Sequence, residues 1–277
     1  MRRQGLVLAT GIGLFLAACA IQSGQPAPSG QNRPPNIVLV IADDLGAAEL
    51  GCYGQQRIRT PRIDGLAAQG VRLTDFNSAA PVCAPSRAML LTGLHAGHAS
   101  VRDNREVGAE GQQPLAPADT TLAQDLRARG YATGLFGKWG LGGPGSGSEP
   151  CDRGFDRFTG YLCQRKAHNH FPAALWRDRE PLPLPGNDPA TRAEVTYAHD
   201  VIRDAALEFV QAHRDRPFFL TFASTLPHCA LQAPPDELAA YAGAFPETPY
   251  DGTKGYLKQA TPRAAYAAMI TRLDHDV

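Results

Sequence analysis

The sequence of 277 residues has no excess of charge of either sign, because 27 Lys and Arg residues balance 27 Asp and Glu residues. A nucleic-acid-binding protein normally carries a basic excess, so we expect no nucleic-acid partner. Wholesale disorder is excluded, since hydrophobic residues make up 43% of the chain and charged residues only 19%. With 28 Gly and 23 Pro residues and no internal repeat, the composition predicts a globular domain with long loops rather than a bundle of helices.

The sequence also lacks an apolar run that could cross a membrane as a helix. An apolar run at residues 6–18 follows the basic residues Arg2 and Arg3; its length of about a dozen residues is too short for ~30 Å of hydrocarbon but typical of a secretory signal. The segment 16–19 (LAAC) resembles a bacterial lipobox. The resemblance implies a lipoprotein signal peptide at 1–19 and an exported protein of the bacterial cell envelope, anchored to the membrane through lipid on Cys19. An ordinary signal peptide is the alternative.

After Cys19 the sequence lacks an even number of cysteines. Residues 20–35 are rich in Gly, Pro, Ser and Gln, so we expect a flexible tether there and the folded domain at 36–277. The remaining cysteines are odd in number, so at least one cannot pair within an exported chain; they are Cys52, Cys83, Cys151, Cys163 and Cys229. The residues around Cys83 indicate that this cysteine is the unpaired one.

Strand-like and helix-like segments alternate along the domain. Apolar runs predict strands, the first of them buried on both faces, at 36–42, 71–76, 131–136 and 217–223. Capping residues and apolar spacing predict helices at 60–70, 85–91, 120–129, 194–213 and 264–277. Thr60 is the expected N-cap of the first helix. The glycine-rich residues 140–160 resemble a loop. We therefore predict an α/β fold with a mostly parallel central sheet, helices on both faces and a site at the carboxyl ends of the strands.

Two carboxylates, Asp43 and Asp44, end the first predicted strand. Neighbouring side chains of a strand point to opposite faces, so both carboxylates can approach one cation only where the pleat ends. Ca²⁺ prefers such oxygen ligands, and Mg²⁺ is the alternative. A solvated turn is the other interpretation of this pair.

The segment 81–93 reads PVCAPSRAMLLTG and contains Cys83 and Arg87. Cys-x-Pro-Ser-Arg followed by a short helix and Thr-Gly resembles the signature of the type I sulfatases, in the alkaline phosphatase superfamily. The segments 35–44, 60–64 (TPRID) and 137–139 (GKW) match the same family in order. The resemblance runs from about residue 36 to the last residue and implies an alkaline phosphatase-like sulfatase fold.

In that family the motif cysteine is oxidised to formylglycine by a formylglycine-generating enzyme. The resemblance therefore implies that a formylglycine hydrate at residue 83 attacks sulfur with one hydroxyl and expels the sulfate with the other. Arg87 lies one helical turn away and can brace the hydrate, while residue 83 joins Asp43 and Asp44 in binding the cation. A buried structural thiol or a disulfide partner is the alternative for Cys83.

Lysine and histidine side chains complete the predicted site. Lys138 follows the strand at 131–136 and can donate to a sulfate oxygen. The family pattern commonly continues with a histidine where this chain has Gly140, so we take His168, in the segment 164–170 (QRKAHNH), as a candidate substitute; a histidine on the substrate rim or the surface is the alternative. His228 ends the segment 223–228 (ASTLPH) and resembles the family histidine that contacts sulfate and protonates the leaving oxygen.

The predicted helix at 264–277 carries no residue that would stop it. The Asp-Asn or Asp-His pair and the second lysine that the family places later do not follow, so we expect a sulfatase catalytic domain that is incomplete at its C-terminus and poorly active. The resemblance implies hydrolysis of sulfate monoesters, with sulfated carbohydrates as the expected substrates. A phosphonate monoester hydrolase or phosphodiesterase of the same superfamily and a catalytically lapsed glycan-binding lipoprotein are the alternatives.

Overall fold

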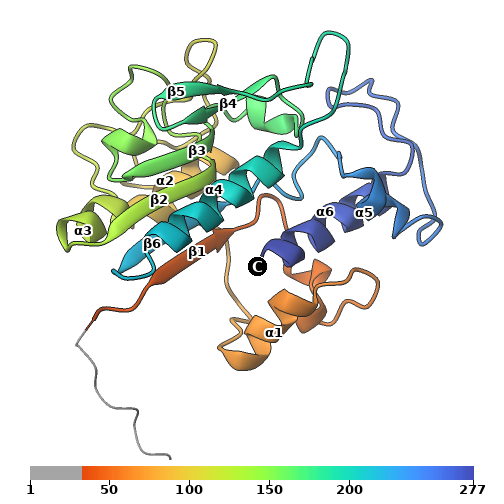
Figure 1. The fold of residues 1–277 in the computed structure, drawn as a ribbon, viewed down its shortest axis with the longest axis horizontal. Helices are drawn as coiled ribbons and strands as arrows, with labels where there is room; N and C mark the ends of the chain where they lie inside the picture. Colours follow the sequence, from red (N-terminus) through yellow and green to blue (C-terminus); the bar gives the residue numbers. More distant parts are fainter. Residues whose placement is uncertain (1–32) are drawn as a thin grey trace, which may run out of the picture. The chain divides into compact units, whose positions relative to one another are not determined.

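The structure is a computed structural model that describes residues 33–277 (Figure 1). The predicted signal peptide at 1–19, the lipidation of Cys19 and most of the tether at 20–35 lie outside the described residues. Within the described part of the chain, no helix combines the length and the apolar character needed to span a bilayer.

A six-stranded sheet organises the described residues, with the strand order β1-β6-β2-β3-β4-β5. Its strands are β1 (Ile37–Ile41), β2 (Ala132–Lys138), β3 (Arg157–Tyr161), β4 (Ala174–Arg177), β5 (Glu180–Pro183) and β6 (Phe218–Ala223). The strands β1, β6, β2 and β3 are parallel, whereas β4 and β5 extend the sheet in antiparallel pairing. The predicted mostly parallel sheet is therefore confirmed.

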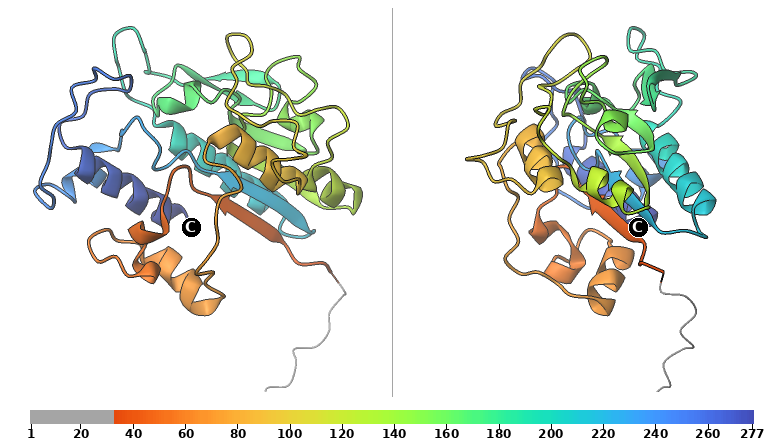
Figure 2. Two further views of the ribbon diagram at one scale, coloured as in Figure 1. Left: turned by 180° about the vertical axis from the view of Figure 1, so that it is seen from behind. Right: turned by 90° about the vertical axis from the view of Figure 1, so that its left-hand side faces the viewer.

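Helices cover both faces of this sheet (Figure 2). On one face the ring of Phe209, from α4, packs on Phe136 at a centroid distance of 5.5 Å. On the other face Ala88 of α2 packs with Leu135 and Phe219. Leu135 and Phe136 are neighbours on β2, so the alternation of a strand sends them into two separate cores. The helices are α1 (Pro61–Gln69), α2 (Cys83–Thr92), α3 (Leu122–Ala128), α4 (Ala198–Ala212), α5 (Pro235–Ala239) and α6 (Pro262–Asp276), with the short 3-10 helices η1 (Ala47–Glu49), η2 (Gly51–Tyr53), η3 (Pro150–Asp152) and η4 (Lys166–His168).

Two predicted strands need correction. Residues 71–76 form no strand, and Val71 and Phe76 are 86% and 74% exposed in the connection between α1 and α2. Alternation alone gave that prediction, but no neighbouring strand pairs with the segment. The first strand, β1, is not a central strand buried on both faces as predicted: it pairs only with β6 within residues 33–277, and Val38 and Val40 remain 56% and 41% exposed.

Other boundaries shift by a few residues. β2 continues to Lys138, so this lysine ends the strand instead of following it, and α2 begins at Cys83 rather than at residue 85. The predicted loop at 140–160 contains the start of β3, and the helix predicted from residue 194 begins only at Ala198. These shifts matter for function, because they fix Lys138 and Cys83 on regular elements.

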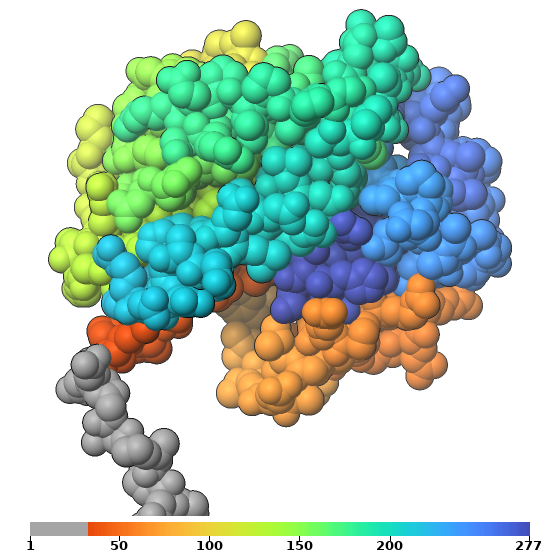
Figure 3. All heavy atoms as spheres, in the orientation of Figure 1, coloured from red at the N-terminus to blue at the C-terminus, as the bar shows by residue number. Residues whose placement is uncertain are grey.

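The helix predicted at 264–277 from its apolar spacing is α6, and it is buried over most of its circumference rather than along one face. Alanines at four positions let neighbouring helices approach closely; they are Ala264, Ala265, Ala267 and Ala268. α6 packs against α5 and α1, and Figure 3 shows α6 beside the α1 segment. The buried Asp274 accepts hydrogen bonds from the backbone N–H groups of Arg62 and Ile63, at 3.0 and 2.8 Å. The cap of α1 therefore comes from α6, and not from the side chain of Thr60 as predicted.

Candidate functional site

The strand register brings the ends of β1, β6 and β2 to one level. Ile41 pairs with Ala223, and Ala223 pairs with Gly137, so the three residues form one row across the sheet. A Cβ at Gly137 would lie 1.9 Å from the carbonyl oxygen of Ala223, so only glycine permits this close approach. Asp43, just past β1, and Lys138, the last residue of β2, therefore lie at the same end of the sheet, with β6 between their strands.

Asp43 is a buried carboxylate held between two cationic side chains. Lys138 Nζ donates to its Oδ2 over 2.7 Å, and the Arg87 guanidinium lies 3.3 Å from its Oδ1. Burial by itself raises the pKa of Asp43, but the positive charges of Arg87, Lys138 and His228 outweigh burial and hold this pKa well below its usual range. Asp43 is therefore a fixed anion around which the cations of the site gather.

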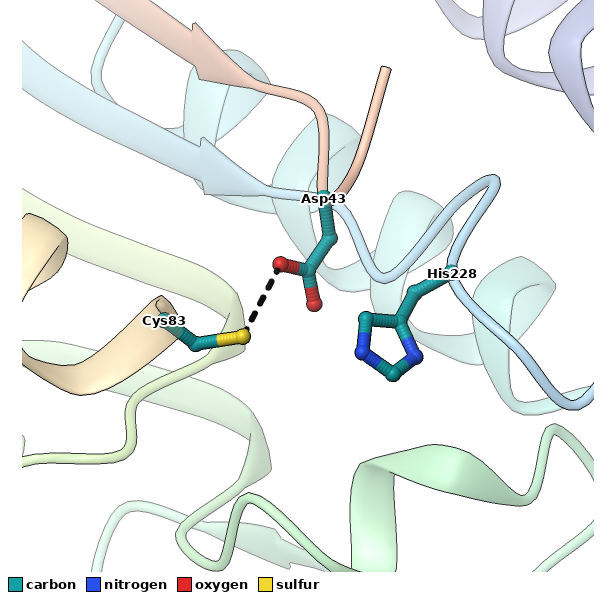
Figure 4. Close-up of side chains that lie close together, drawn as sticks. All are labelled: Asp43, Cys83 and His228. Carbon is teal, nitrogen blue, oxygen red and sulfur yellow. Dashed lines mark hydrogen bonds between the residues drawn. The ribbon is translucent and has the colours of Figure 1, made fainter. Parts of the chain in front are cut away.

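Cys83 is the first residue of α2 and faces this group (Figure 4). Its Sγ lies 3.7 Å from Asp43 Oδ1 and 3.5 Å from Lys138 Nζ. Burial raises the pKa of the thiol, which Lys138 and Arg87 counteract only in part. Arg87, one turn along the helix, also donates to the backbone carbonyl of Lys138 over 2.6 Å, so α2 and β2 are tied together beneath residue 83.

The cysteines of the described residues form no disulfide: Cys52, Cys83, Cys151, Cys163 and Cys229 are all free. A disulfide role for Cys83 is therefore not realised within residues 33–277. Its position at the amino end of α2 also suits anions, because the first turn of a helix presents unpaired N–H groups.

His228 follows β6 and approaches the site from the opposite side (Figure 4). Its Nε2 lies 3.3 Å from Asp44 Oδ2, and its Nδ1 contacts the carbonyl oxygen of Cys229. The ring of His168 stacks on that of His228, with centroids 4.6 Å apart and an interplanar angle of 15°. Burial, followed by the charges of His228 and Lys138, lowers the pKa of His168 to about 4. His168 is therefore neutral near pH 7 and can accept a hydrogen bond in the cavity that it shares with Cys83.

The structure groups the possible metal ligands differently from the sequence-based prediction. Asp43, Cys83 and His228 each offer a ligand atom, and these atoms lie within 4.8 Å of one another. Asp44 is not in this group: its side chain is 66% exposed and faces His228. A carboxylate, an imidazole and residue 83 are suitable donors for a divalent cation, and replacement of the thiol sulfur by oxygen would shift the set towards hard ions such as Ca²⁺.

A cavity of about 310 Å³ opens in front of Cys83, and much of it is lined by residues that belong to no sequence motif. It is lined by Asp44, Cys83, His168 and His228, and also by Asn104, Gln112, Gln164 and Tyr256. Gln164 lies in the segment 164–170, in which the sequence pointed only to the histidines. Gln112 and Tyr256 belong to loops with no motif, so no sequence signal pointed to them.

Comparison with known proteins identifies relatives of the whole described domain. The family model described as Sulfatase matches residues 35–277. Arylsulfatase A of Homo sapiens is 40% identical over 225 residues, which are 71% of this chain and 42% of that protein. The chain spans less than half the length of the curated relatives it matches.

Two solved structures are similar to this chain in fold and have been studied with carbohydrates. Ps i-CgsB in complex with k-i-k-neocarrahexaose matches with a TM-score of 0.73 and 27% identity, over 87% of this chain and 53% of that one. A protein solved with its substrate D-glucosamine-2-N,6-O-disulfate matches with a TM-score of 0.63 and 28% identity, over 77% of this chain and 39% of that one.

Proposed function

This chain belongs to the sulfatase family, and from that premise we propose that it hydrolyses sulfate monoesters of carbohydrates. The observation that carries the proposal is the convergence of Cys83, Lys138 and Arg87 around the buried Asp43. This arrangement places a nucleophile position at a helix amino end, with two cationic side chains beside it to hold an anion. Such a site suits a sulfate group whose sulfur faces residue 83.

The proposed nucleophile is a formylglycine hydrate, made from Cys83 by a formylglycine-generating enzyme. An unmodified thiol would be a weak nucleophile here, because burial raises its pKa. One hydroxyl oxygen of the hydrate attacks sulfur while the bond from sulfur to the alcohol oxygen breaks. The other hydroxyl then loses its proton and becomes the carbonyl oxygen, and the sulfate leaves with the electrons of its bond to carbon.

Side chains on both sides of residue 83 serve these steps. Lys138 and Arg87 balance the negative charge of the sulfate oxygens. His228 protonates the leaving alcohol oxygen, since an imidazole can transfer protons near neutral pH. His168 stacks on His228 and fixes the orientation of its ring.

A divalent cation, Ca²⁺ or Mg²⁺, is the proposed cofactor. Asp43 and residue 83, whose ligand atoms already lie within 4.8 Å of each other, would hold it, and Asp44, which contacts His228, would have to turn towards them to add its carboxylate. When bound, it favours the ionised form of the residue 83 hydroxyl and offsets charge on the sulfate. Binding is checked without activity: addition of Ca²⁺ should raise the melting temperature of the wild type and leave that of Asp43→Asn unchanged.

Carbohydrates are the proposed substrate class because of the space next to residue 83. The cavity of about 310 Å³ adjoins one of about 750 Å³, and Arg165, His168 and Tyr256 line both. Arg192 and Lys254 add positive charge to the larger cavity. The carbohydrate complexes of the two structural relatives support the same class. The similarity to a phosphonate monoester hydrolase, at 20% identity, shows a shared fold alone.

Mass spectrometry of the peptide that contains residue 83 tests the proposed nucleophile. After co-expression with a formylglycine-generating enzyme, the peptide should lose about 18 Da relative to the thiol form, through loss of sulfur and two hydrogens and gain of oxygen. The modified chain should release sulfate from a sulfated sugar slowly and should not cleave a phosphate diester, whereas Cys83→Ala should cleave neither ester. An unmodified thiol would favour a lapsed, glycan-binding protein, and faster cleavage of the diester would favour a phosphodiesterase.

Export and lipid anchoring are proposed from the sequence of residues 1–19 alone. In bacteria fed a labelled fatty acid, the wild-type chain should carry the label and sediment with membranes. Cys19→Ala should lose the label and appear in the soluble envelope fraction, and equal labelling of both chains would contradict the anchor.

A further inference from the structure

Two buried carboxamides in the wall of the cavity beside residue 83 carry atoms that have no hydrogen-bond partner among residues 33–277. Gln112 is 2% exposed, and neither its Oε1 nor its Nε2 has a partner. Gln164 is 5% exposed, its Oε1 has no partner, and its Nε2 makes only a long contact of 3.5 Å with the carbonyl oxygen of Gly140. Buried polar atoms in proteins are nearly always paired, so this concentration of unpaired atoms in one cavity points to a polar ligand.

The backbone holds both carboxamides in place. Gln112 forms an isolated antiparallel bridge with Glu106, and the next residue, Gln113, donates its N–H to the carbonyl of Arg105 over 2.8 Å. Gln164 fills the space next to Gly140, where a Cβ would lie 2.0 Å from Gln164 Nε2. The φ of Gly140 is +74°, so a side chain at this position is disfavoured by strain as well as by contact. The glycine therefore admits the carboxamide of Gln164 to the cavity.

The chemistry of the carboxamides differs from that of the proposed sulfate site. Sulfate oxygens only accept hydrogen bonds, and Lys138 and Arg87 already provide donors and charge for them. Each carboxamide carries both a donor and an acceptor, which complements hydroxyl groups that donate and accept in turn. A phenol has no further hydroxyl groups, so as the alcohol part of the ester it would leave these carboxamide atoms unpaired. Its sulfate ester would therefore bind with lower affinity.

We propose that Gln112 and Gln164 form a hydroxyl-recognition site that selects a sugar over an aryl alcohol as the leaving group. The inference rests on the proposed function and names the feature of the substrate that the cavity recognises. Both residues are specificity residues, since they contact the alcohol part of the ester and take no part in bond breaking.

The test compares two sulfate monoesters that differ only in their alcohol, glucosamine 6-sulfate and 4-nitrophenyl sulfate. Binding of each to the whole chain is measured by calorimetry for the wild type, Gln112→Leu and Gln164→Leu. Each variant should bind the sugar sulfate about 10- to 100-fold more weakly, because its hydroxyls lose a partner. The aryl sulfate should bind a few times more tightly, because leucine makes the cavity more apolar.

A matched control and a stability measurement separate recognition from misfolding. Gln113→Leu alters the adjacent residue, whose Nε2 donates to the carbonyl of Ser100 outside the cavity, and should leave both affinities unchanged. Thermal melts of the unliganded chains should show Gln112→Leu and Gln164→Leu to be more stable than the wild type, because an unpaired buried amide has been removed.

The proposed hydroxyl-recognition site would be wrong if the leucine variants lost affinity for both esters equally, or if they lost no affinity for the sugar sulfate. Failure of the proposed function has a different signature, in which the wild type binds neither ester. Unsulfated glucosamine then tests the carboxamides by themselves: weaker binding by both leucine variants supports the site, and equal binding by all chains refutes it.

Discussion

Asp43 is the residue on which the charges of the site converge, and its ion pairs are also structural. The side chain of Lys138 is 0% exposed and that of Asp43 is 6% exposed, so their contact is fully desolvated. Removal of one partner from a buried pair leaves an uncompensated charge, which costs far more than loss of a surface pair.

Lys138→Met should therefore lower the free energy of unfolding by about 3 kcal/mol, even though the long apolar stem is preserved. The control is Arg157→Met, which removes a pair with Asp178 whose side chains are 55% and 36% exposed and should cost under about 1 kcal/mol. Urea denaturation of both variants measures the difference. Equal losses would show that the Asp43 pair is not structurally important.

A second residue-scale prediction concerns the buried His170. Its side chain is 0% exposed, and burial is the main cause that lowers its pKa from 6.5 to about 4. The unfolded chain therefore binds this proton more readily than the folded chain, so stability is complete above about pH 6.5 and falls as pH drops towards 4. Between these limits the histidine accounts for a loss of about 3 kcal/mol.

Urea denaturation at pH 7 and pH 4.5 checks this dependence. His170→Gln cannot titrate and should show a clearly smaller loss on acidification than the wild type. His213→Gln, at a partly buried site near the end of α4, serves as the control and should retain the wild-type pH profile. An unaltered loss in His170→Gln would mean that other groups control the acid response.

At the scale of elements, remote carboxylates cap two helices. The carboxylate of Asp274, in α6, accepts hydrogen bonds from the first backbone N–H groups of α1. The carboxylate of Glu247 accepts hydrogen bonds from the N–H groups of Arg263 and Ala264 at the start of α6, at 3.0 and 2.8 Å. Each cap ties a helix to a segment that is not its sequence neighbour. The helices around α6 therefore depend on one another for stability.

Asp274→Ala should destabilise the chain by about 1–2 kcal/mol, because two N–H groups at the start of α1 lose their acceptor. Asp274→Asn should recover part of the loss, since its side-chain oxygen can still accept. The control is Asp251→Ala, in an exposed turn, for which we expect a change of about 0.5 kcal/mol or less. Chemical denaturation measures all three, and a neutral Asp274→Ala would contradict the cap.

At the scale of the whole molecule, charge is balanced overall but not locally. The formal net charge is zero, yet the larger cavity carries Arg165, Arg192 and Lys254 on its wall. Arg165 pairs with Glu106 at 3.4 Å, and the carboxylates in the same wall face neutral donors: Asp188 accepts from Ala190 and Thr191, and Glu194 accepts from Gln232. A longer anionic chain that extends from residue 83 would therefore meet Arg192 and Lys254 as the cationic side chains of this wall.

The double variant R192A/K254A should bind a sulfated oligosaccharide about fivefold more weakly and with a shallower dependence on salt. A sulfated monosaccharide, which does not reach the larger cavity, should be affected much less. The control R57A/R129A removes the same charge from exposed positions outside both cavities and should change neither affinity. If both double variants lowered the affinity equally, the net charge of the protein, and not the position of Arg192 and Lys254, would explain the loss.

Much of this molecule could be predicted from its sequence because the signals are local. Apolar runs identified β1, β2 and β6, and the order of strands and helices gave the parallel sheet. The residues Asp43, Cys83, Lys138 and His228 stand at the ends of these elements, and the parallel arrangement necessarily brings such ends together. Sequence patterns failed at residues 71–76, because an alternating segment becomes a strand only if another strand pairs with it.

The sequence by itself indicated the family, the strands β1, β2 and β6, and four residues of the site: Asp43, Cys83, Lys138 and His228. Only the tertiary structure decided that β1 lies at an edge, that His168 stacks on His228, and that Gln112 and Gln164 line the same cavity unpaired. The physical reason is range: strand and helix patterns repeat over a few residues, whereas contacts such as Asp274 with Arg62 join positions 212 residues apart. Such contacts depend on how complete elements pack, and no short segment of the sequence encodes them.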